Sequence, residues 1–457
     1  MHELSSGTIL VIGAGPAGLA AAASLKALGV PFEIVDAQNH VGGVWNVAND
    51  DAPSWPSKRM TTSKNNGQFE DLRMPVSFPA YPSTDEYATY LRAYTAHHQL
   101  TDYFTPNTEV RRMRDFGEGT WEVEFSNGAV RPYAGIIAAH GVSNRPFLPP
   151  LFLEAKERGA NVIHSKNFAG AEFTPAKNVL VIGSGQCAAD VATELADGTR
   201  RVALHASEGH WVVPRTIGGV SADTLAQAEP GFLGARLNEA IAEKAVHTLV
   251  GHPASVGLPE PTVPLLEDEV IVSDDLLPMI ADRRIELLPD ARHLPFESFD
   301  LIVFATGYEP GADYLPPHLA DNLVLGAFPA DRSDIAVLGQ VRVQGSVTPV
   351  LVDQADIAAY VMKARQEDNT AQLAAFDALK ALGDEGIPVT RPNSSSGGVR
   401  GTLAHLLGRG AASTSRTSRA LLPTAQAPSE DRALELPLSE RRTLLQRLQV
   451  ARSIFEQ

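Results

Sequence analysis

The sequence predicts an α/β fold with two doubly wound parallel-sheet units, one inserted into the other, and a C-terminal extension. Two similar stretches, "ILVIGAGPAGLA" at residues 9–20 and "VLVIGSGQCAAD" at residues 179–190, each give an apolar strand, a glycine turn and a helix start. Strand and helix patterns alternate through about the first 390 residues, which is typical of parallel sheets covered by helices. The composition then shifts toward Ser, Gly, Ala and Arg, which predicts a loosely packed segment.

The bulk composition describes a soluble globular protein. Of its 457 residues, 44% are apolar and 20% are charged, and the net charge of −16 argues against broad nucleic-acid binding. A single cysteine excludes an internal disulfide, and the pair His97-His98 lacks partners at metal-ligand spacing, so we expect no metal. With neither a signal-peptide pattern nor a membrane-spanning apolar run, we expect a cytoplasmic protein without membrane contact.

The remaining elements follow from local patterns. Short apolar runs predict further strands at residues 32–37, 135–141, 201–206 and 300–308. The stretch "TDEYATYLRAYTAHHQ" predicts a helix with Thr84 as its cap, and "TWEVEFSNGAVRPY" predicts a hairpin that turns at Asn127-Gly128. The last twenty residues predict an amphipathic helix that starts near Ser439. We expect its apolar stripe to dock on the chain's own core or on a second subunit rather than to recruit a partner.

These elements divide the chain into four segments. The first domain takes residues 1–170, the inserted second domain takes 171–299, and a return segment at 300–385 completes the first domain. Residues 386–457 form the low-complexity linker and the C-terminal helix.

The first glycine turn, "GAGPAG", predicts a dinucleotide site. Gly13 permits the tight turn, Gly15 lets a pyrophosphate approach the backbone, and Gly18 lets the helix pack on the strand. The phosphates then lie at a helix N-terminus, where free N–H groups favour anions. Asp36 ends the next strand, 23 residues after Gly13, and its carboxylate can accept hydrogen bonds from a ribose. Strand, turn, helix and acidic strand end together make this pattern specific.

The second glycine turn, "GSGQCA", is less complete. Its third glycine is replaced by Ala188, and the strand end that corresponds to Asp36 reads Ala206-Ser207, with neither a carboxylate nor an arginine. This absence favours NADPH over NADH weakly, with Ser207 and Arg215 as candidate contacts. Cys187 begins the helix, and we expect it to pack beneath a pyrophosphate rather than to react.

Two dinucleotide sites in one chain imply hydride transfer between a nicotinamide and a flavin. At this point the chain resembles the class B flavoprotein monooxygenases, in particular the flavin-containing monooxygenase family, over about residues 8–385. The pieces that carry the resemblance follow the family's order: "GAGPAGL", "GGVWN", "MPVSFPAYPSTDEYATYLRAY", "RPFLPP", "IHSKNF", "GSGQCAAD", "HWVVPR", "VSDDLLPMIADRRIEL", "FATGY" and "GQVRVQGSVTPVLVDQADIAAYV". The resemblance implies a Rossmann-like FAD-binding domain with an inserted Rossmann-like domain for NADPH, with NADH left open.

The resemblance also implies a reaction. NADPH reduces FAD, reduced FAD reacts with O2 to give a C4a-(hydro)peroxyflavin, and this species oxygenates a small nucleophilic amine or sulfide. Baeyer–Villiger oxygenation of a ketone and an uncoupled NAD(P)H oxidase or reductase stay open as alternatives. A silent flavoprotein that binds a partner through its C-terminal tail is the non-enzymatic alternative, which the intact glycine turns disfavour. A homodimer is expected by resemblance.

This sequence matches only some of the residues that the family places at its active site and in its linkers. Members of the family place an asparagine shortly before a lysine; alignment on Lys64 puts Thr61 there, with Asn65 and Asn66 as nearby catalytic candidates. His164 and Phe168 match half of the family's linker fingerprint FxGxxxHxxx(F/Y), whose first half is absent. The residues implied to bind the two cofactors are Gly13, Gly15, Pro16, Ala17, Gly18, Asp36, Gly43, Val44, Trp45, Val110, His140, Gly183, Ser184, Gly185, Gln186, Cys187, Ser207, Arg215, Thr306 and Gly307.

Overall fold

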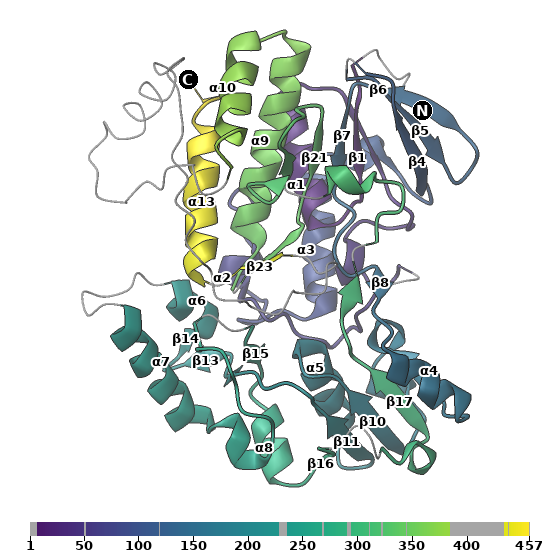
Figure 1. Cartoon of the computed structure of the whole chain (residues 1–457), viewed down its shortest axis with the longest axis vertical. Coiled ribbons are helices and arrows are strands. Elements are labelled where there is room, and N and C mark those ends of the chain that lie inside the picture. Colours follow the sequence, from purple (N-terminus) through teal and green to yellow (C-terminus); the bar gives the residue numbers. More distant parts are fainter. Residues whose placement is uncertain are drawn as a thin grey trace, which may run out of the picture.

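Two five-stranded parallel sheets form the framework of the protein (Figure 1). The structure, a computed structural model, describes residues 7–49, 52–117, 119–227, 235–266, 269–289, 294–309, 311–320, 323–343, 345–383, 434–436 and 438–456. The first sheet has the order β21-β7-β1-β2-β3, with strands Ile335–Val337, Gly135–Ala138, Ile9–Ile12, Phe32–Val35 and Phe104–Thr105. The second has the order β16-β11-β10-β17-β9, with strands Ile285–Leu287, Arg201–His205, Asn178–Ile182, Leu301–Phe304 and Val162–His164. The predicted fold class, with two Rossmann-like units, is confirmed.

The two faces of the first sheet are covered by different layers. Ile9 and Val11 belong to a core shared with α1 (Pro16–Ala27) and α9 (Thr348–Gln366). Leu10 and Ile12 belong to a second core, formed with the small antiparallel sheet of β4 (Val110–Asp115), β5 (Trp121–Phe125) and β6 (Val130–Tyr133). Because both faces are buried, β1 is apolar at every position instead of alternating with polar residues.

The second sheet is built in the same way. Val179 and Val181 of β10 pack in a core with α5 (Gln186–Leu195) and α8 (Leu276–Ala281). On the other face, Leu180 packs near α4 (Pro150–Glu157) and the Phe296 ring. The apolar strand that precedes each glycine turn is therefore fixed on both sides, which holds the turn rigidly at the end of the strand.

The predicted domain boundary at residue 300 is wrong for strand β17. This strand pairs with β10 on one side and β9 on the other, so it belongs to the second sheet, as does β9 itself. The chain re-enters the first sheet only at β21, which pairs with β7. A buried run of four apolar residues fits either sheet, and strand pairing is decided by contacts far apart in the sequence, so the local pattern could not assign it.

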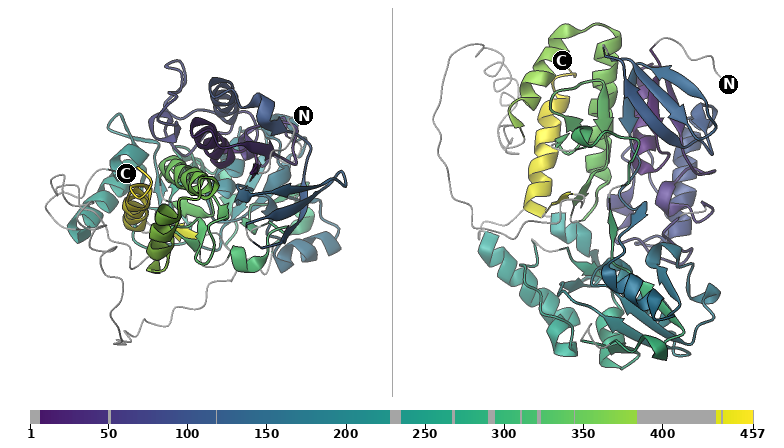
Figure 2. Two further views of the ribbon diagram at one scale, coloured as in Figure 1. Left: turned by 90° about the horizontal axis from the view of Figure 1, so that it is seen from above. Right: turned by 45° about the vertical axis from the view of Figure 1, so that its right-hand side comes forward.

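The C-terminal helix packs on the chain's own core. Helix α13 (Leu438–Arg452) runs beside α9, next to α10 (Thr370–Lys380), as Figures 1 and 2 show. The predicted stripe of Leu444, Leu448 and Ile454 is buried in the core of the first unit. Strand β23 (Leu434–Leu436) pairs in parallel with β22 (Val341–Val343). Most of the predicted low-complexity linker, residues 384–433, lies outside the described residues.

Two local predictions had different outcomes. Helix α3 (Thr84–His97) forms where predicted, but its cap is Ser83: the Ser83 Oγ accepts from the Glu86 N–H at 3.2 Å, and the Glu86 carboxylate accepts from the Ser83 N–H at 2.7 Å. The Thr84 hydroxyl instead donates to a backbone carbonyl at 3.0 Å. The β5–β6 hairpin turns at Asn127-Gly128 as predicted, with Gly128 at φ +78°.

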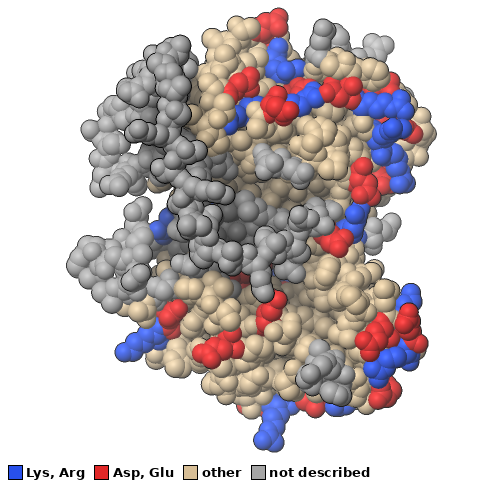
Figure 3. All heavy atoms as spheres, viewed as in Figure 1, with Lys and Arg blue, Asp and Glu red and all other residues tan. Residues whose placement is uncertain are grey.

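The remaining described elements surround this framework, and none of the described helices combines the length and apolarity that a membrane crossing requires. On the face shown in Figure 3, basic and acidic side chains are interspersed. The other elements used below are α2 (Lys64–Gly67), β8 (Arg145–Pro146), β12 (Val212–Val213), β13 (Thr216–Ile217), β14 (Val220–Ser221), α6 (Ala222–Gln227), α7 (Ala235–Val250), β15 (Ile271–Val272) and β18 (Tyr308–Glu309).

Candidate functional site

A cavity of about 880 Å³ opens where β1, β2 and β7 of the first sheet end. Its volume lies within the roughly 300–1,000 Å³ that is usual for cofactor sites, and the carboxyl edge of a parallel sheet is the usual place for one. Of the residues singled out from the sequence, those that line it are Gly13, Gly15, Pro16, Ala17, Asp36, Gly43, Val44, Trp45, Thr61, Val110 and His140.

The glycines of the first turn divide into two kinds. Gly13 and Gly18 are required by packing, because a Cβ on Gly13 would lie 2.4 Å from the Ala139 carbonyl oxygen and one on Gly18 would lie 1.9 Å from the Gly13 oxygen. Gly15 faces open space, and the nearest atom to its Cβ position is the Gly43 Cα at 3.8 Å. Gly15 also caps the N-terminus of α1. The result is a side-chain-free surface at a helix N-terminus, which fits a pyrophosphate.

Asp36 presents a carboxylate at the end of β2. Its Oδ2 accepts from the Ala14 N–H at 2.7 Å and its Oδ1 accepts from the Gln38 N–H at 2.8 Å. Burial raises the pKa of this carboxyl, and the two N–H donors oppose the shift. Each oxygen keeps a further lone pair, so the group can also accept from the hydroxyls of a ribose in the cavity.

An uncharged polar pair borders the same cavity. The His140 Nδ1 lies 2.9 Å from the Tyr314 hydroxyl, and both residues line the cavity. Burial lowers the pKa of His140 to about 4 and raises the pKa of the Tyr314 phenol well above its usual range. At neutral pH the pair therefore offers hydrogen bonds without charge. Tyr314 was missed in the sequence because it comes from a loop with no local pattern.

The three catalytic candidates are placed differently. Thr61 lines the cavity, whereas Asn65 is exposed and neither asparagine is among the lining residues. The Asn66 side-chain amide donates to the Thr224 hydroxyl of α6 at 3.0 Å, and the Asn66 backbone carbonyl accepts from the Ser346 hydroxyl at 2.5 Å. Asn66 thus joins the first unit to the second in this structure, and only Thr61 faces the space in which a cofactor and substrate would meet.

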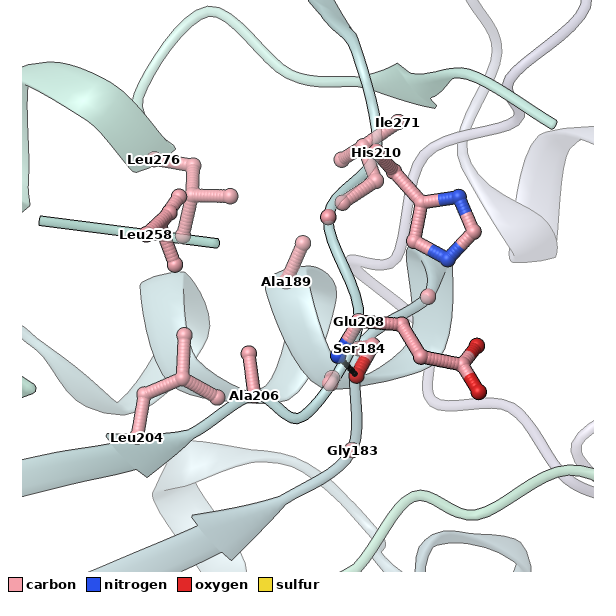
Figure 4. Close-up of a pocket in the computed structure, with 13 residues that line it drawn as sticks. Gly183, Ser184, Ala189, Leu204, Ala206, Glu208, His210, Leu258, Ile271 and Leu276 are labelled. Carbon is pink, nitrogen blue, oxygen red and sulfur yellow. Dashed lines mark hydrogen bonds between the residues drawn. The ribbon is translucent and has the colours of Figure 1, made fainter. Parts of the chain in front are cut away.

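The second glycine turn borders a crevice that encloses only about 20 Å³, so a dinucleotide would lie along its open side (Figure 4). Gly183, Ser184 and Gly185 line it together with Ala206 and Glu208. The Ser184 hydroxyl accepts from the backbone N–H of Ser207 and of Glu208, both at 3.0 Å, and so fixes the loop after β11. In Figure 4 the Glu208 side chain extends on the side of the turn opposite to the apolar wall of Leu258 and Leu276.

Glu208 is a second residue that sequence reasoning missed. The expected acidic position after β11 holds Ala206 and Ser207, and the carboxylate stands just beyond them, exposed at the crevice. Two other side chains that were expected to contact the cofactor, those of Gln186 and Arg215, already bond other residues of the protein. The Gln186 side chain bonds both the N–H and the carbonyl of Val272, at 2.8 and 3.1 Å, and Arg215 pairs with Asp274 at 3.1 Å. Gln186, Cys187, Ser207 and Arg215 lie outside the crevice lining.

The linker residue His164 connects two loops of the second unit. Its Nδ1 accepts from the Lys166 N–H and its Nε2 donates to the Gly307 carbonyl, both at 3.1 Å. Burial lowers the pKa of His164 to about 4, so the ring is neutral near pH 7. Phe168 is buried and packs edge-on against Trp55, with ring centroids 4.9 Å apart. Thr306, beside Gly307, donates to the Phe147 carbonyl at 2.7 Å.

We predict that His164 makes the protein sensitive to acid. The folded state holds its pKa near 4 and the unfolded chain near 6.5, so its contribution is present above pH 6.5 and is lost as the pH falls toward 4. The loss should be on the order of 3 kcal/mol across this range. Urea unfolding of wild type and His164→Gln at pH 7.5 and 4.5 measures it: the wild-type advantage should shrink at pH 4.5. An advantage that is the same at both pH values would contradict the prediction.

Side chains from both units form hydrogen bonds between the two units close to the large cavity. The Asp223 carboxylate of α6 is buried and accepts from the Ser63 N–H at 2.8 Å and from the Ser63 hydroxyl at 2.9 Å. The Tyr81 hydroxyl donates to the Arg215 carbonyl and accepts from the Ala222 N–H at 3.2 Å. These contacts fix the loop that carries Thr61 against the second unit.

Comparisons with known proteins agree on one family. Residues 6–374 match the family model described as FMO-like, flavin-binding monooxygenase-like. The chain is 24% identical over 316 residues to a probable indole-3-pyruvate monooxygenase, YUCCA1, of Arabidopsis thaliana, covering 66% of this chain and 75% of the relative. It is 26% identical over 392 residues to the flavin-containing monooxygenase 3 of Homo sapiens, covering 78% of this chain and 73% of the relative.

Solved structures show the same fold at low identity. A cyclohexanone monooxygenase in a loose conformation superposes with a TM-score of 0.62 at 16% identity, covering 79% of this chain and 88% of that one. A flavin-containing monooxygenase from Stenotrophomonas maltophilia gives a TM-score of 0.52 at 17% identity, covering 80% of this chain and 99% of that one. Because the family model spans most of the sequence, the protein belongs to the flavin-binding monooxygenase-like family and is a flavin-dependent monooxygenase.

Proposed function

We propose that the protein is an FAD- and NADPH-dependent monooxygenase that oxygenates a small nucleophilic amine or sulfide. One atom of O2 enters the substrate and the other leaves as water, while the coenzyme gives a hydride and solvent gives a proton. The observation that carries this proposal is the 880 Å³ cavity, at which the open Gly15–Gly43 surface and the Asp36 carboxylate meet. NADH stays open as the donor, because no described arginine lines the crevice at the second turn.

The residues present fit FAD. The N-terminus of α1 and the bare backbone of Gly15 and Gly43 would hold the pyrophosphate, and Asp36 would accept from the ribose. The bound flavin supplies the electron transfer and the activation of O2. The chain's own task is to orient both reactants and to exclude water, which the aromatic side chains of Trp45 and Tyr87 in the cavity lining favour.

The choice of amine or sulfide rests on the relatives. Their names include flavin-containing monooxygenases and a dimethylaniline monooxygenase of Oryctolagus cuniculus that forms N-oxides. The structural neighbours include an S-allyl-L-cysteine S-oxygenase from Allium sativum and several cyclohexanone monooxygenases. We therefore place N- or S-oxygenation ahead of Baeyer–Villiger chemistry for this chain.

A second candidate is an uncoupled NAD(P)H oxidase. The observation that favours it is the position of Asn66, whose amide bonds Thr224 while Thr61 occupies the cavity wall. A threonine offers one hydroxyl where an amide offers two N–H donors and a carbonyl, so fewer hydrogen bonds would protect bound oxygen from release as peroxide.

One experiment separates the two functions. Purified protein loaded with FAD is given NADPH and O2 with a tertiary amine, a thioether or a cyclic ketone, and consumed coenzyme, oxygenated product and H2O2 are counted. A monooxygenase gives product that matches most of the NADPH consumed with at least one probe. Stoichiometric H2O2 with every probe would establish the oxidase, and no NADPH consumption at all would overturn both functions.

We predict that Glu208 weakens the use of NADPH. A carboxylate at the crevice repels the 2′-phosphate of NADPH but can accept from the free ribose hydroxyl of NADH. In Glu208→Gln, the ratio of kcat/KM for NADPH to that for NADH should rise about fivefold, because one solvated charge pair is worth about 1 kcal/mol. Glu172→Gln removes the same charge from an exposed position outside both sites and should leave the ratio unchanged. An equal response in the two variants would contradict the prediction.

A cytoplasmic location and a homodimer stay predictions of the sequence and the family. Sedimentation of the purified full chain tests the homodimer directly, and fractionation of the source cells tests the location.

A further inference from the structure

The C-terminal helix is fixed to the rest of the protein at both of its ends. At its C-terminal end, Arg452 pairs with Asp353 at 3.3 Å and with Asp356 at 2.9 Å, both on α9. Near its N-terminal end, Arg441 is only 3% exposed, and its Nε donates to the Ser346 carbonyl at 2.9 Å. The match to the family model ends at residue 374, so Arg441 lies outside the matched residues.

The segment that Arg441 holds is a wall of the large cavity. Gly345, Ser346, Val347 and Thr348 line the cavity between the end of β22 and the start of α9. The Ser346 hydroxyl donates to the Asn66 carbonyl at 2.5 Å, and the Thr348 hydroxyl donates to the Gly67 carbonyl at 3.3 Å. The wall is therefore bonded on one side to the loop that carries the catalytic candidates and on the other side to Arg441.

The Arg441 guanidinium is also subject to the charge of the Asp223 carboxylate on α6. Burial and the neighbouring Arg442 lower the pKa of Arg441, and the Asp223 carboxylate of α6 opposes the shift. Asp223 accepts from Ser63, which lies in the same loop as Thr61. A buried arginine costs stability unless its donors are satisfied, and the Ser346 carbonyl accepts from one of the Arg441 donors.

We propose that Arg441 is a positioning residue of the flavin site: the C-terminal helix completes the cavity, and Arg441 fixes the wall at residues 345–348 through the Ser346 carbonyl. The chemical function of the wall rests on the proposed function, whereas its dependence on Arg441 does not. Strand β23 pairs with β22, whose Val341 and Val343 also line the cavity, so the C-terminal extension contacts the cavity lining at a second place.

The test compares three variants of the full chain. Arg441→Met keeps an unbranched side chain and removes the hydrogen-bond donor, whereas Arg441→Lys keeps a cationic donor. Arg452→Met removes the ion pairs with α9 at the far end of the same helix, away from the cavity lining. The readouts are the Kd for FAD of the apoprotein, the visible spectrum of the bound flavin, and the amide hydrogen exchange of residues 345–350.

Arg441→Met should raise the Kd for FAD about tenfold, because a hydrogen bond from a charged donor to a buried carbonyl is lost. Arg441→Met should also shift the spectrum of the bound flavin and speed amide exchange at residues 345–350. Arg441→Lys should show smaller changes in all three readouts. Arg452→Met should change none of the three, even where it lowers the Tm. Equal effects of Arg441→Met and Arg452→Met would overturn the proposal. If the wild type binds no FAD, the proposed function fails, and the hydrogen-exchange data alone decide the role of Arg441. If Arg441→Met does not fold, the comparison of Arg441→Lys with Arg452→Met decides whether Arg441 positions the wall.

Discussion

Gly15→Ala is expected to weaken flavin binding strongly while the protein stays folded, and Gly185→Ala is expected to slow flavin reduction by NAD(P)H strongly while flavin binding persists. Both substitutions add a methyl group to a face that the protein itself leaves open. The nearest atom to the new Cβ at position 15 would be the Gly43 Cα at 3.8 Å, and none lies within 4 Å of the one at position 185. The methyl would instead meet a pyrophosphate that has to approach the backbone at this point.

The measurements separate the two sites. We expect the Kd for FAD to rise by about two orders of magnitude or more in Gly15→Ala, since a methyl at the phosphate removes close contacts to a dianionic group. Gly185→Ala should bind FAD as the wild type does, and its rate of anaerobic flavin reduction by NAD(P)H should fall by about two orders of magnitude or more. Unchanged circular dichroism and Tm in both variants would show that the fold is intact.

Gly13→Ala is the contrasting substitution. Its Cβ would lie 2.4 Å from the Ala139 carbonyl oxygen, and its φ of +104° is one that alanine rarely adopts. This variant should lose stability as well as the flavin. If Gly15→Ala behaves like Gly13→Ala, or if it binds FAD as the wild type does, then the first turn does not hold the pyrophosphate.

The sequence predicted the parts of the site that depend on neighbouring residues. A glycine turn between a buried strand and a helix is local, so the positions of Gly13, Gly15 and Asp36 around one cavity followed from spacing alone. The hairpin turn at Asn127-Gly128 is local in the same sense. The cap of α3 was misplaced by one residue because Ser83 and Thr84 are both good caps, and only the Glu86 side chain decides between them.

The sequence did not predict what depends on contacts between distant segments. The assignment of β17 to the second sheet requires its pairing with β9, and no pattern within the strand contains that information. The contact of Asn66 with Thr224, and that of Arg441 with Ser346, join segments more than 90 residues apart. Glu208 is a different case: it is local to β11 and follows Ser207 directly in the sequence.

The contact between Lys58 and Asp190 should show how strongly the two units are held together. Lys58, in the first unit, lies 3.5 Å from Asp190 on α5, and their side chains are only 14% and 10% exposed. Removal of one partner leaves a buried charge without compensation, so Lys58→Met should cost about 3–5 kcal/mol in the free energy of unfolding. Asp190 also accepts from the Gln186 amide at 2.8 Å, so its position bears directly on the second glycine turn.

The double variant Lys58→Met/Asp190→Leu is the sharper measurement. With both charges gone and apolar side chains in their place, its free energy of unfolding should exceed that of Lys58→Met, although it carries one more substitution. Arg158→Met removes two exposed ion pairs of the second unit, with Glu154 and with Glu297, and should change stability by about 1 kcal/mol or less. Urea denaturation of the wild type, Lys58→Met, Asp190→Leu, the double variant and Arg158→Met at one pH gives the comparison. A double variant that loses the sum of both single effects would mean that Lys58 and Asp190 act independently, and that the two units are aligned by the Ser63–Asp223 contact and its neighbours instead.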